Sequence, residues 1–341
     1  MEGIDALEWL THPAIGGKSP GTWLAFLAIL LSLLAFDLMV LGRRWHDRPP
    51  TARESLALAG FFIASAIAYG AWVWLRFGHE SGLHFFTGYL VEEALSLDNI
   101  FVISVIFASL GIPGKYQHGV LFWGILGAVV MRGLMIALGT ALVSRIASVL
   151  YIFGAFLIYT GIRMLRGGDD AHDPADNRLL RFLKGHFHVT DRLHGDHFFV
   201  RLPVEDEPGR GAAQGKARRV LHMTPLFVAL VLVEGADLVF AVDSVPAIFA
   251  ITTDPYVVYT SNMFAILGLR ALYFSLAALV RRFRYLKTAL SVLLVFIGGK
   301  IFYNHFFEPI TPVVSLLGTL GILAAGVLVS LVRTGGEAPA D

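Results

Sequence analysis

The chain has 341 residues, of which 56% are hydrophobic and 16% charged, and its formal net charge is +1. Soluble globular proteins carry about 25% charged residues, so this composition indicates an integral membrane protein. The small net charge argues against a nucleic-acid partner. The absence of cysteine excludes disulfides, thiolate metal sites and cysteine nucleophiles. The amino terminus, MEGIDALEWLTHPA, lacks a basic segment, so we expect no signal or transit peptide.

Apolar segments long enough to cross a bilayer follow one another along the chain. They are Thr22–Gly42, Glu54–Leu75, Leu83–Leu110, His118–Val143, Ser148–Leu165, His222–Ile251, Tyr256–Val280, Thr288–Asn304 and Val313–Val332. The sequence therefore predicts an all-α polytopic membrane protein with about nine transmembrane helices.

Basic residues gather on one side of this predicted arrangement, for example Arg43 and Arg44 after the first span and Arg281 and Arg282 after the seventh. The positive-inside rule then places the N-terminus outside and the C-terminus inside the cytoplasmic membrane. We divide the chain into spans one to five (residues 1–166), a polar, His-rich cytoplasmic loop (167–219), spans six to nine (220–333) and a cytoplasmic tail (334–341).

The cytoplasmic loop is rich in histidine, including His186-x-His188 and His194-x-x-His197. A metal-sensing role and an ordinary polar loop both remain open, because no carboxylate spacing completes a metal site. The stretch HVTDRLHGDHFFVRL alternates around a turn, which predicts a small hairpin.

Two of the predicted spans carry more than one carboxylate each, in addition to Asp37 in the first span. Glu92 and Asp98 are in the third, and Glu234, Asp237 and Asp243 are in the sixth. Carboxylates at membrane depth are costly, so they usually face a protein interior or a water-filled cavity and serve a function. Because a proline removes a backbone donor, we expect the sixth span to unwind near Pro246. The third span has no equivalent proline, so a break there is a hypothesis without a sequence signal of its own.

The candidate ligands are all oxygen donors, which suit Mg²⁺, Ca²⁺ or Mn²⁺ better than Zn²⁺ or Cu⁺. The predicted metal site contains Asp37, Glu92, Asp98, Asn99, Glu234, Asp237, Asp243 and Ser244, with Arg132, Arg270 and Lys300 as balancing charges. The competing interpretation is that the acids form structural ion pairs with the two deep arginines. Asp37 also suits an ion pair with Arg43 or Arg44. Asn262 suits a helix cap or a place along the ion path, and Glu93 is expected to face away from Glu92.

Spans three to five and six to eight match each other in order. Glu92 and Asp98 correspond to Asp237 and Asp243, Arg132 to Arg270, and Arg163 to Lys300. Since each unit has three spans, the second unit enters the membrane from the opposite side. This arrangement predicts two inverted three-helix repeats, as in secondary transporters.

The stretches YLVEEALSLDNIFV, LVEGADLVFAVDSVPAIFAIT and SNMFAILGLRALYF closely resemble the TerC family, named for tellurite resistance and including Alx-type members. The resemblance runs from the Asp37 segment to about Phe302. It implies a nine-span cytoplasmic-membrane protein of the LysE-type transporter superfamily, associated with manganese export and homeostasis. The family's intramembrane acids correspond to Asp37, Glu92, Asp98, Glu234, Asp237 and Asp243, with Asn99 beside them.

The leading hypothesis is therefore export of Mn²⁺ from the cytoplasm by alternating access, with proton exchange as one means of coupling. Mn²⁺ would be the cargo, and no permanently bound cofactor is expected. The alternative is a membrane partner or scaffold that does not transport and serves a metal or tellurite stress response. We expect no enzymatic activity, since no protease or ATP-binding motif is present.

Overall fold

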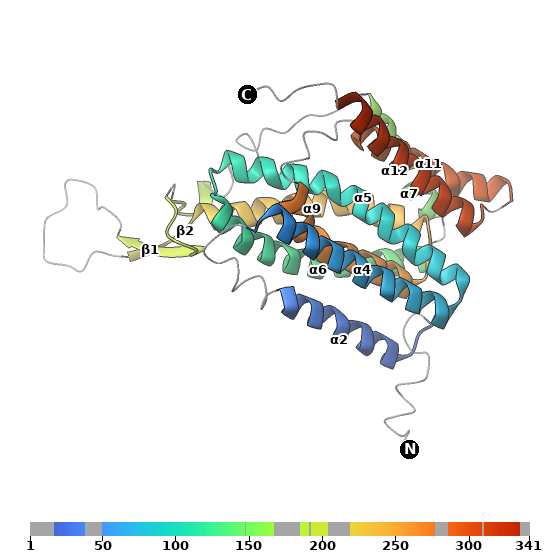
Figure 1. Cartoon of the computed structure of the whole chain (residues 1–341), viewed down its shortest axis with the longest axis horizontal. Helices are drawn as coiled ribbons and strands as arrows, with labels where there is room; N and C mark the ends of the chain where they lie inside the picture. The colour runs from blue at the N-terminus through green and yellow to red at the C-terminus, as the bar shows by residue number, and fades with distance from the viewer. Residues whose placement is uncertain are drawn as a thin grey trace, which may run out of the picture.

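The computed structural model describes residues 17–37, 50–146, 148–166, 185–190, 192–203, 219–276, 286–308 and 310–334. Within these residues the protein is a bundle of helices, with a small pair of strands beyond one end of it (Figure 1). The helices are α2 (Pro20–Phe36), α4 (Ala52–Phe77), α5 (His79–Ser109), α6 (Gly114–Arg145), α7 (Val149–Leu165), α9 (Pro225–Phe249), α10 (Pro255–Leu276), α11 (Leu286–Phe306) and α12 (Pro312–Thr334), and the strands are β1 (Phe199–Pro203) and β2 (Arg219–Met223).

Each predicted span overlaps one of these helices. In the described part of the chain, six helices are long and apolar enough to cross a membrane: α4, α6, α9, α10, α11 and α12. Helices α2 and α7 are apolar but have only 17 residues each. Helix α5 has 31 residues and carries Glu92, Glu93 and Asp98. A multi-pass, all-α membrane protein is confirmed, whereas nine crossings stay a prediction.

Several helices begin at a proline that follows a polar residue. The pairs are Ser19-Pro20, Thr224-Pro225, Asp254-Pro255 and Thr311-Pro312. Proline fits the first helical position because that residue has no intrahelical partner for its N–H, and the residue before it takes the extended backbone of a cap. The Asp254 carboxylate accepts from the backbone N–H of Tyr256 at 2.9 Å, which fixes the start of α10.

Helix α10 is the centre of the bundle. Within the apolar window of α10, 83% of the residues are buried, compared with 22–44% in the other five candidate spans. It packs against α2, α4, α5 and α6. The hydroxyls of Tyr69 and Tyr256 contact each other and join α4 to α10. Residues of α10 are therefore well placed to complete a buried site.

Helices α7 and α11 approach each other unusually closely. A Cβ on Gly161 would lie 2.7 Å from the backbone oxygen of Ser291, and a Cβ on Gly298 would lie 2.6 Å from that of Gly154. Small residues allow such backbone contact between membrane helices. The two contacts show that α7 and α11 run antiparallel.

The expected unwinding near Pro246 is not observed. Helix α9 continues through Pro246 to Phe249, and α5 is also continuous. Pro246 lies close to the C-terminal end of α9, where it removes a single backbone hydrogen bond. The helix continues because the following residues keep their bonds, such as that from the Ala250 N–H to the Pro246 oxygen at 3.0 Å.

The predicted hairpin within HVTDRLHGDHFFVRL is wrong in its pairing. Strand β1 pairs antiparallel with β2, which follows it in the sequence, with Val200 opposite His222. The first half of that stretch contributes only a parallel bridge between Val189 and Met223. All five residues of β1 pair with residues of β2, so β2 takes the place that the predicted hairpin gave to the first half of the stretch. Helix α9 accordingly starts at Pro225, after the predicted start of the sixth span at His222.

Candidate functional site

An arginine on α6 joins two carboxylates from different helices. Arg132 is 1% exposed and forms an ion pair with Glu92 of α5. It also contacts Asp237 of α9 twice, with Nη2 at 2.6 Å from Oδ1 and Nε donating to Oδ2 at 3.2 Å. Such two-pronged contacts fix the orientation of both groups. With both acids ionised, this cluster has one more negative than positive charge.

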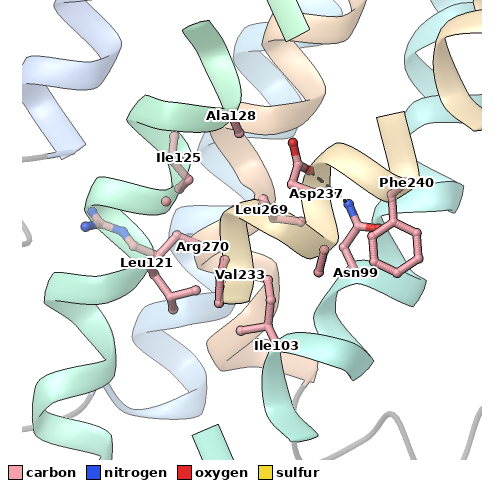
Figure 2. A pocket seen from close by; sticks show the side chains of 12 residues that line it. Asn99, Ile103, Leu121, Ile125, Ala128, Val233, Asp237, Phe240, Leu269 and Arg270 are labelled. Carbon is pink, nitrogen blue, oxygen red and sulfur yellow. Dashed lines mark hydrogen bonds between the residues drawn. The ribbon is translucent and has the colours of Figure 1, made fainter. Parts of the chain in front are cut away.

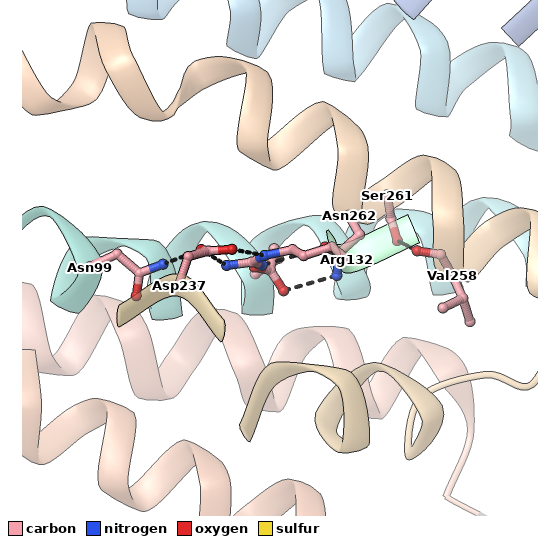
Figure 3. A network of polar contacts seen from close by, with 7 residues as sticks. Asn99, Arg132, Asp237, Val258, Ser261 and Asn262 are labelled. Atoms are coloured by element: carbon pink, nitrogen blue, oxygen red, sulfur yellow. Dashed lines mark hydrogen bonds and ion pairs between the residues drawn. The ribbon is translucent and has the colours of Figure 1, made fainter. Parts of the chain in front are cut away.

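Two amides extend the cluster. Asn99 of α5 donates to Asp237 Oδ1 at 3.4 Å, and Asn262 of α10 donates to Glu92 Oε2 at 2.9 Å. Arg132 Nη1 in turn donates to Asn262 Oδ1 at 3.4 Å. Figure 3 shows this continuous chain of contacts, to which α5, α6, α9 and α10 all contribute. We call it the Arg132 cluster, made of Glu92, Asn99, Arg132, Asp237 and Asn262.

The second deep arginine has different partners. Arg270 of α10 forms an ion pair with Asp37 at the end of α2, and donates to the Asp37 backbone oxygen at 3.0 Å. Arg270 Nη1 also lies 3.0 Å from His118 Nδ1, which must accept because arginine has no acceptor. Asp37 and Arg270 balance each other's charge. Of the two roles that the sequence left open for Asp37, the structure shows an ion pair, although its partner is Arg270.

Further buried carboxylate oxygens lie nearby. Both oxygens of Glu93 and Oε2 of Glu234 are buried and have no hydrogen-bond partner among the described residues. The carboxyl of Glu234 lies against Gly127 of α6, where any side chain would collide with it. Glu93 points toward Gly268 of α10, since a Cβ there would be 3.9 Å from Oε1. Acidic oxygens thus exceed what the two arginines contact.

A small cavity adjoins the Arg132 cluster. Its volume is about 20 Å³, and Asn99, Asp237 and Arg270 contribute polar groups to an otherwise apolar lining. In Figure 2, Asn99 and Asp237 point toward each other across one side of it. A cavity needs roughly 10–15 Å³ to hold one water molecule. This cavity therefore accommodates a single water or one small ion.

The predicted residues are brought together only in part. Glu92, Asn99, Asp237 and Arg132 are joined as described. Ser244 is buried, and its hydroxyl has no hydrogen-bond partner among the described residues. Lys300 is 6% exposed and donates to Ser315 of α12 at 3.1 Å. Asp98 and Asp243 belong to α5 and α9, but their side chains lie outside the described residues, as do Arg43 and Arg44.

In the part of the chain that the structure describes, no three histidine or acidic side chains are arranged to hold a metal ion. The guanidinium of Arg132 instead lies between Glu92 and Asp237. An ion could reach both carboxylates only if this guanidinium moved. Two members of these networks, Asn262 and His118, were not predicted as site residues, because a single polar residue in an apolar helix has no distinctive spacing.

Comparison with known proteins identifies the family. The pattern described as "Integral membrane protein TerC family" matches residues 77–337. The chain belongs to the TerC family. Over 324 residues it is 44% identical to an uncharacterized membrane protein of Myxococcus xanthus, covering 95% of each chain.

Relatives in enteric bacteria are similarly close to this TerC-family protein. It is 41% identical over 313 residues to a protein of Escherichia coli K12, provisionally named membrane-bound redox modulator Alx, covering 89% of this chain and 92% of that one. The Alx of Shigella flexneri matches to the same extent. No solved structure matches the chain.

Proposed function

We propose that this TerC-family protein exports divalent metal ions from the cytoplasm, with Mn²⁺ as the principal cargo. The observation that supports this best is the composition of the Arg132 cluster, in which two acids, Glu92 and Asp237, share one guanidinium. Carboxylate and amide oxygens are the ligands that Mn²⁺, Mg²⁺ and Ca²⁺ prefer. A purely structural arrangement needs no surplus acid, because an uncompensated buried charge is costly.

Arg132 would act as an internal substitute for the cargo. In the described conformation its guanidinium pairs with both Asp237 and Glu92 and offsets one of their two charges, which holds the cation-free site together. An ion entering the cavity beside Asn99 and Asp237 would compete with Arg132 for the same oxygens. After release, either Arg132 returns or the acids take up protons. Proton uptake would couple export to an inward proton flow.

The inverted repeat that alternating access requires is supported by the contact between α7 and α11. In the register that aligns Arg163 with Lys300, Gly161 corresponds to Gly298 and Gly154 to Ser291. The two close contacts, Gly154 with Gly298 and Gly161 with Ser291, are then exchanged by the same correspondence. A two-fold axis in the membrane plane produces such an exchange. From the distribution of basic residues we also propose an N-terminus outside and a C-terminus inside the cytoplasmic membrane.

The test is Mn²⁺ flux in proteoliposomes, comparing the wild type with Asp98→Asn, Asp237→Asn and Asp243→Asn. We expect each variant to lose most of its flux while keeping its folded elution profile. Asp254→Asn is the matched control, since Asp254 is a carboxylate at the start of α10 that pairs with Lys18. Unchanged flux in all three site variants would contradict the proposed site. Absence of flux in the folded wild type would contradict transport.

The second candidate is a membrane partner that does not transport. Exposed apolar side chains near the strands, Phe187, Phe199 and Leu221, favour it as a contact surface. The name of the Alx relatives refers to redox modulation; without cysteine, any such effect of this chain would not use its own thiols. Suppose that changing Phe199 and Leu221 to serine abolishes the protein's effect on the metal or tellurite stress response but leaves Mn²⁺ flux intact. That result would favour the hypothesis of a membrane partner.

A further inference from the structure

Two histidines that are far apart in the sequence lie side by side next to β2. The parallel bridge between Val189 and Met223 makes the preceding residues, His188 and His222, lateral neighbours. The backbone confirms this register, because the Met223 N–H donates to the His188 oxygen at 2.8 Å and the Thr190 N–H to the Met223 oxygen at 2.9 Å. The two imidazole rings are 5.3 Å apart between centroids and inclined at 69°.

The hydrogen bonding of His222 determines which of its nitrogens is available. Its Nδ1 lies 2.9 Å from the backbone oxygen of Val220. A carbonyl oxygen only accepts, so Nδ1 bears the proton and Nε2 of the neutral ring keeps its lone pair. Histidines that bind metals are usually oriented in this way, with the second ring nitrogen donating to a carbonyl or carboxylate. His222 is thus held in a tautomer ready to bind a metal through Nε2.

We propose that His188 and His222 form a binding site for one transition-metal ion of the kind that prefers imidazole: Cu²⁺, Ni²⁺ or Zn²⁺. His188 is exposed and His222 half-buried, so water can reach the remaining coordination positions. In the described part of the chain no third histidine or acid completes the site, which makes it a two-ligand site open to solvent. Imidazole ligands favour Cu²⁺ most and Mn²⁺ least, unlike the oxygen ligands of the Arg132 cluster.

The position of this pair relates it to α9. Strand β2 ends at Met223, and α9 begins at Pro225 and carries Glu234 and Asp237. Thr224, between them, donates its hydroxyl to the His197 backbone oxygen at 2.8 Å. A metal bound by the pair would therefore fix the segment that enters α9. The binding site itself does not depend on the proposed transport.

The first test is Cu²⁺ binding by the full-length protein, purified without a polyhistidine tag. We expect the tightest single equivalent of Cu²⁺ to show coupling to two nitrogens in its paramagnetic resonance spectrum. Loss of an outer partner of a ligand already costs roughly 10- to 100-fold in affinity, so His188→Gln and His222→Gln should weaken that equivalent at least tenfold. His79→Gln is the control, because His79 packs on Trp74 at the start of α5.

Unchanged Cu²⁺ affinity in both His188→Gln and His222→Gln would overturn the proposal, and so would an equal loss in His79→Gln. The second test measures adjacency without a metal. Lateral neighbours in a sheet are about 4.8 Å apart, within the Cα separation that a disulfide spans. Because the natural chain has no cysteine, His188→Cys combined with His222→Cys introduces the only two thiols. Rapid cross-linking by a mild oxidant is expected, and its absence would overturn the pairing.

Discussion

The two deep arginines occupy corresponding positions of the predicted repeats but have different electrostatic surroundings. Arg270 pairs with Asp37 and receives further contacts from a backbone oxygen and from His118, which are uncharged. Arg132 is shared between Glu92 and Asp237. The Arg270 pair is balanced in charge, whereas the Arg132 cluster is one negative charge in excess. The same residue type therefore forms a single ion pair in one place and, under the proposed transport, would act as a substitute cation in the other.

Under the proposed function, the number of acids around a buried arginine, rather than the arginine itself, distinguishes the candidate ion site from a structural ion pair. Both guanidinium groups are 1% exposed and both join helices. The cavity beside the Arg132 cluster is lined by Asp237 and Asn99 of that cluster and also by Arg270, whereas Asp37 is not among its lining residues. Substitutions that change the charge balance should consequently have different effects at the two places.

The largest expected effect is on stability. Arg270→Gln leaves Asp37 buried without its cation, and removal of one partner of a buried ion pair costs about 3–5 kcal/mol. Thermal unfolding in detergent should show this loss. The double variant Asp37→Asn with Arg270→Gln should recover much of it, because neither charge remains. If the double variant is as unstable as Arg270→Gln alone, the Asp37 contact is not the source of the stability.

The effect of added Mn²⁺ should distinguish Arg132→Gln from Arg270→Gln more clearly. Arg132→Gln leaves Glu92 and Asp237 facing each other, so added Mn²⁺ should bind between them and raise the unfolding temperature. A ligand at a hundredfold excess over its dissociation constant stabilises the folded state by about 2.7 kcal/mol. Among the described residues Arg270 forms its ion pair with one carboxylate, Asp37, and Asp237 remains paired with Arg132, so Arg270→Gln should gain far less. An equal rise in unfolding temperature in both variants would contradict the distinction between the Arg132 cluster and the ion pair of Arg270 with Asp37.

The sequence predicted the helices well because their signals are local. Apolar runs about 20 residues long mark a helix. The start of α9 is marked by Thr224-Pro225, a signal that the predicted start at His222 did not use. The pairing of β1 with β2 was missed because it joins segments separated by a long connection. The effect of Pro246 was overestimated, since its cost depends on how much helix follows, and α9 ends at Phe249.

The candidate site was predicted by residue type but not by partnership. Glu92, Asn99, Asp237 and Arg132 were all expected at membrane depth, and they do meet. Arg132 pairs with Glu92 and Asp237, whereas Arg270 pairs with Asp37. These pairings depend on how α2, α6 and α10 pack, which no spacing in the sequence reveals. Asn262 was undervalued for the same reason, because its contact with Glu92 crosses between α10 and α5.

A smaller effect is expected at Asn262. Asn262→Ala removes the donor to Glu92 Oε2 and leaves that buried oxygen unpartnered, which costs about 1–3 kcal/mol. Ser261→Ala is the matched control on the same helix. The Ser261 hydroxyl donates to carbonyls of α10 itself, at 2.8 Å to Val257 and at 3.3 Å to Val258, and Figure 3 shows the second of these contacts. Such bonds contribute little to helix stability. Equal unfolding temperatures for the two variants would show that the amide does not support the cluster.

The smallest change in stability, and the most informative about function, is expected at Asn99. Its amide donates to Asp237 over 3.4 Å, a long contact, so Asn99→Ala should cost only about 0.5–1.5 kcal/mol. Its carbonyl Oδ1 is buried and has no hydrogen-bond partner among the described residues, although Asn99 lines the cavity.

If Asn99 Oδ1 is a ligand for the cargo, Asn99→Ala should weaken Mn²⁺ binding more than it weakens the fold. Asn99→Asp, which has a stronger oxygen donor, should retain or increase Mn²⁺ affinity. Calorimetric titration of both variants measures this directly. A parallel fall in Mn²⁺ affinity and stability, with no difference between Ala and Asp, would make Asn99 a support for Asp237 alone. The cluster would then resemble the ion pair of Arg270 with Asp37 more than a binding site.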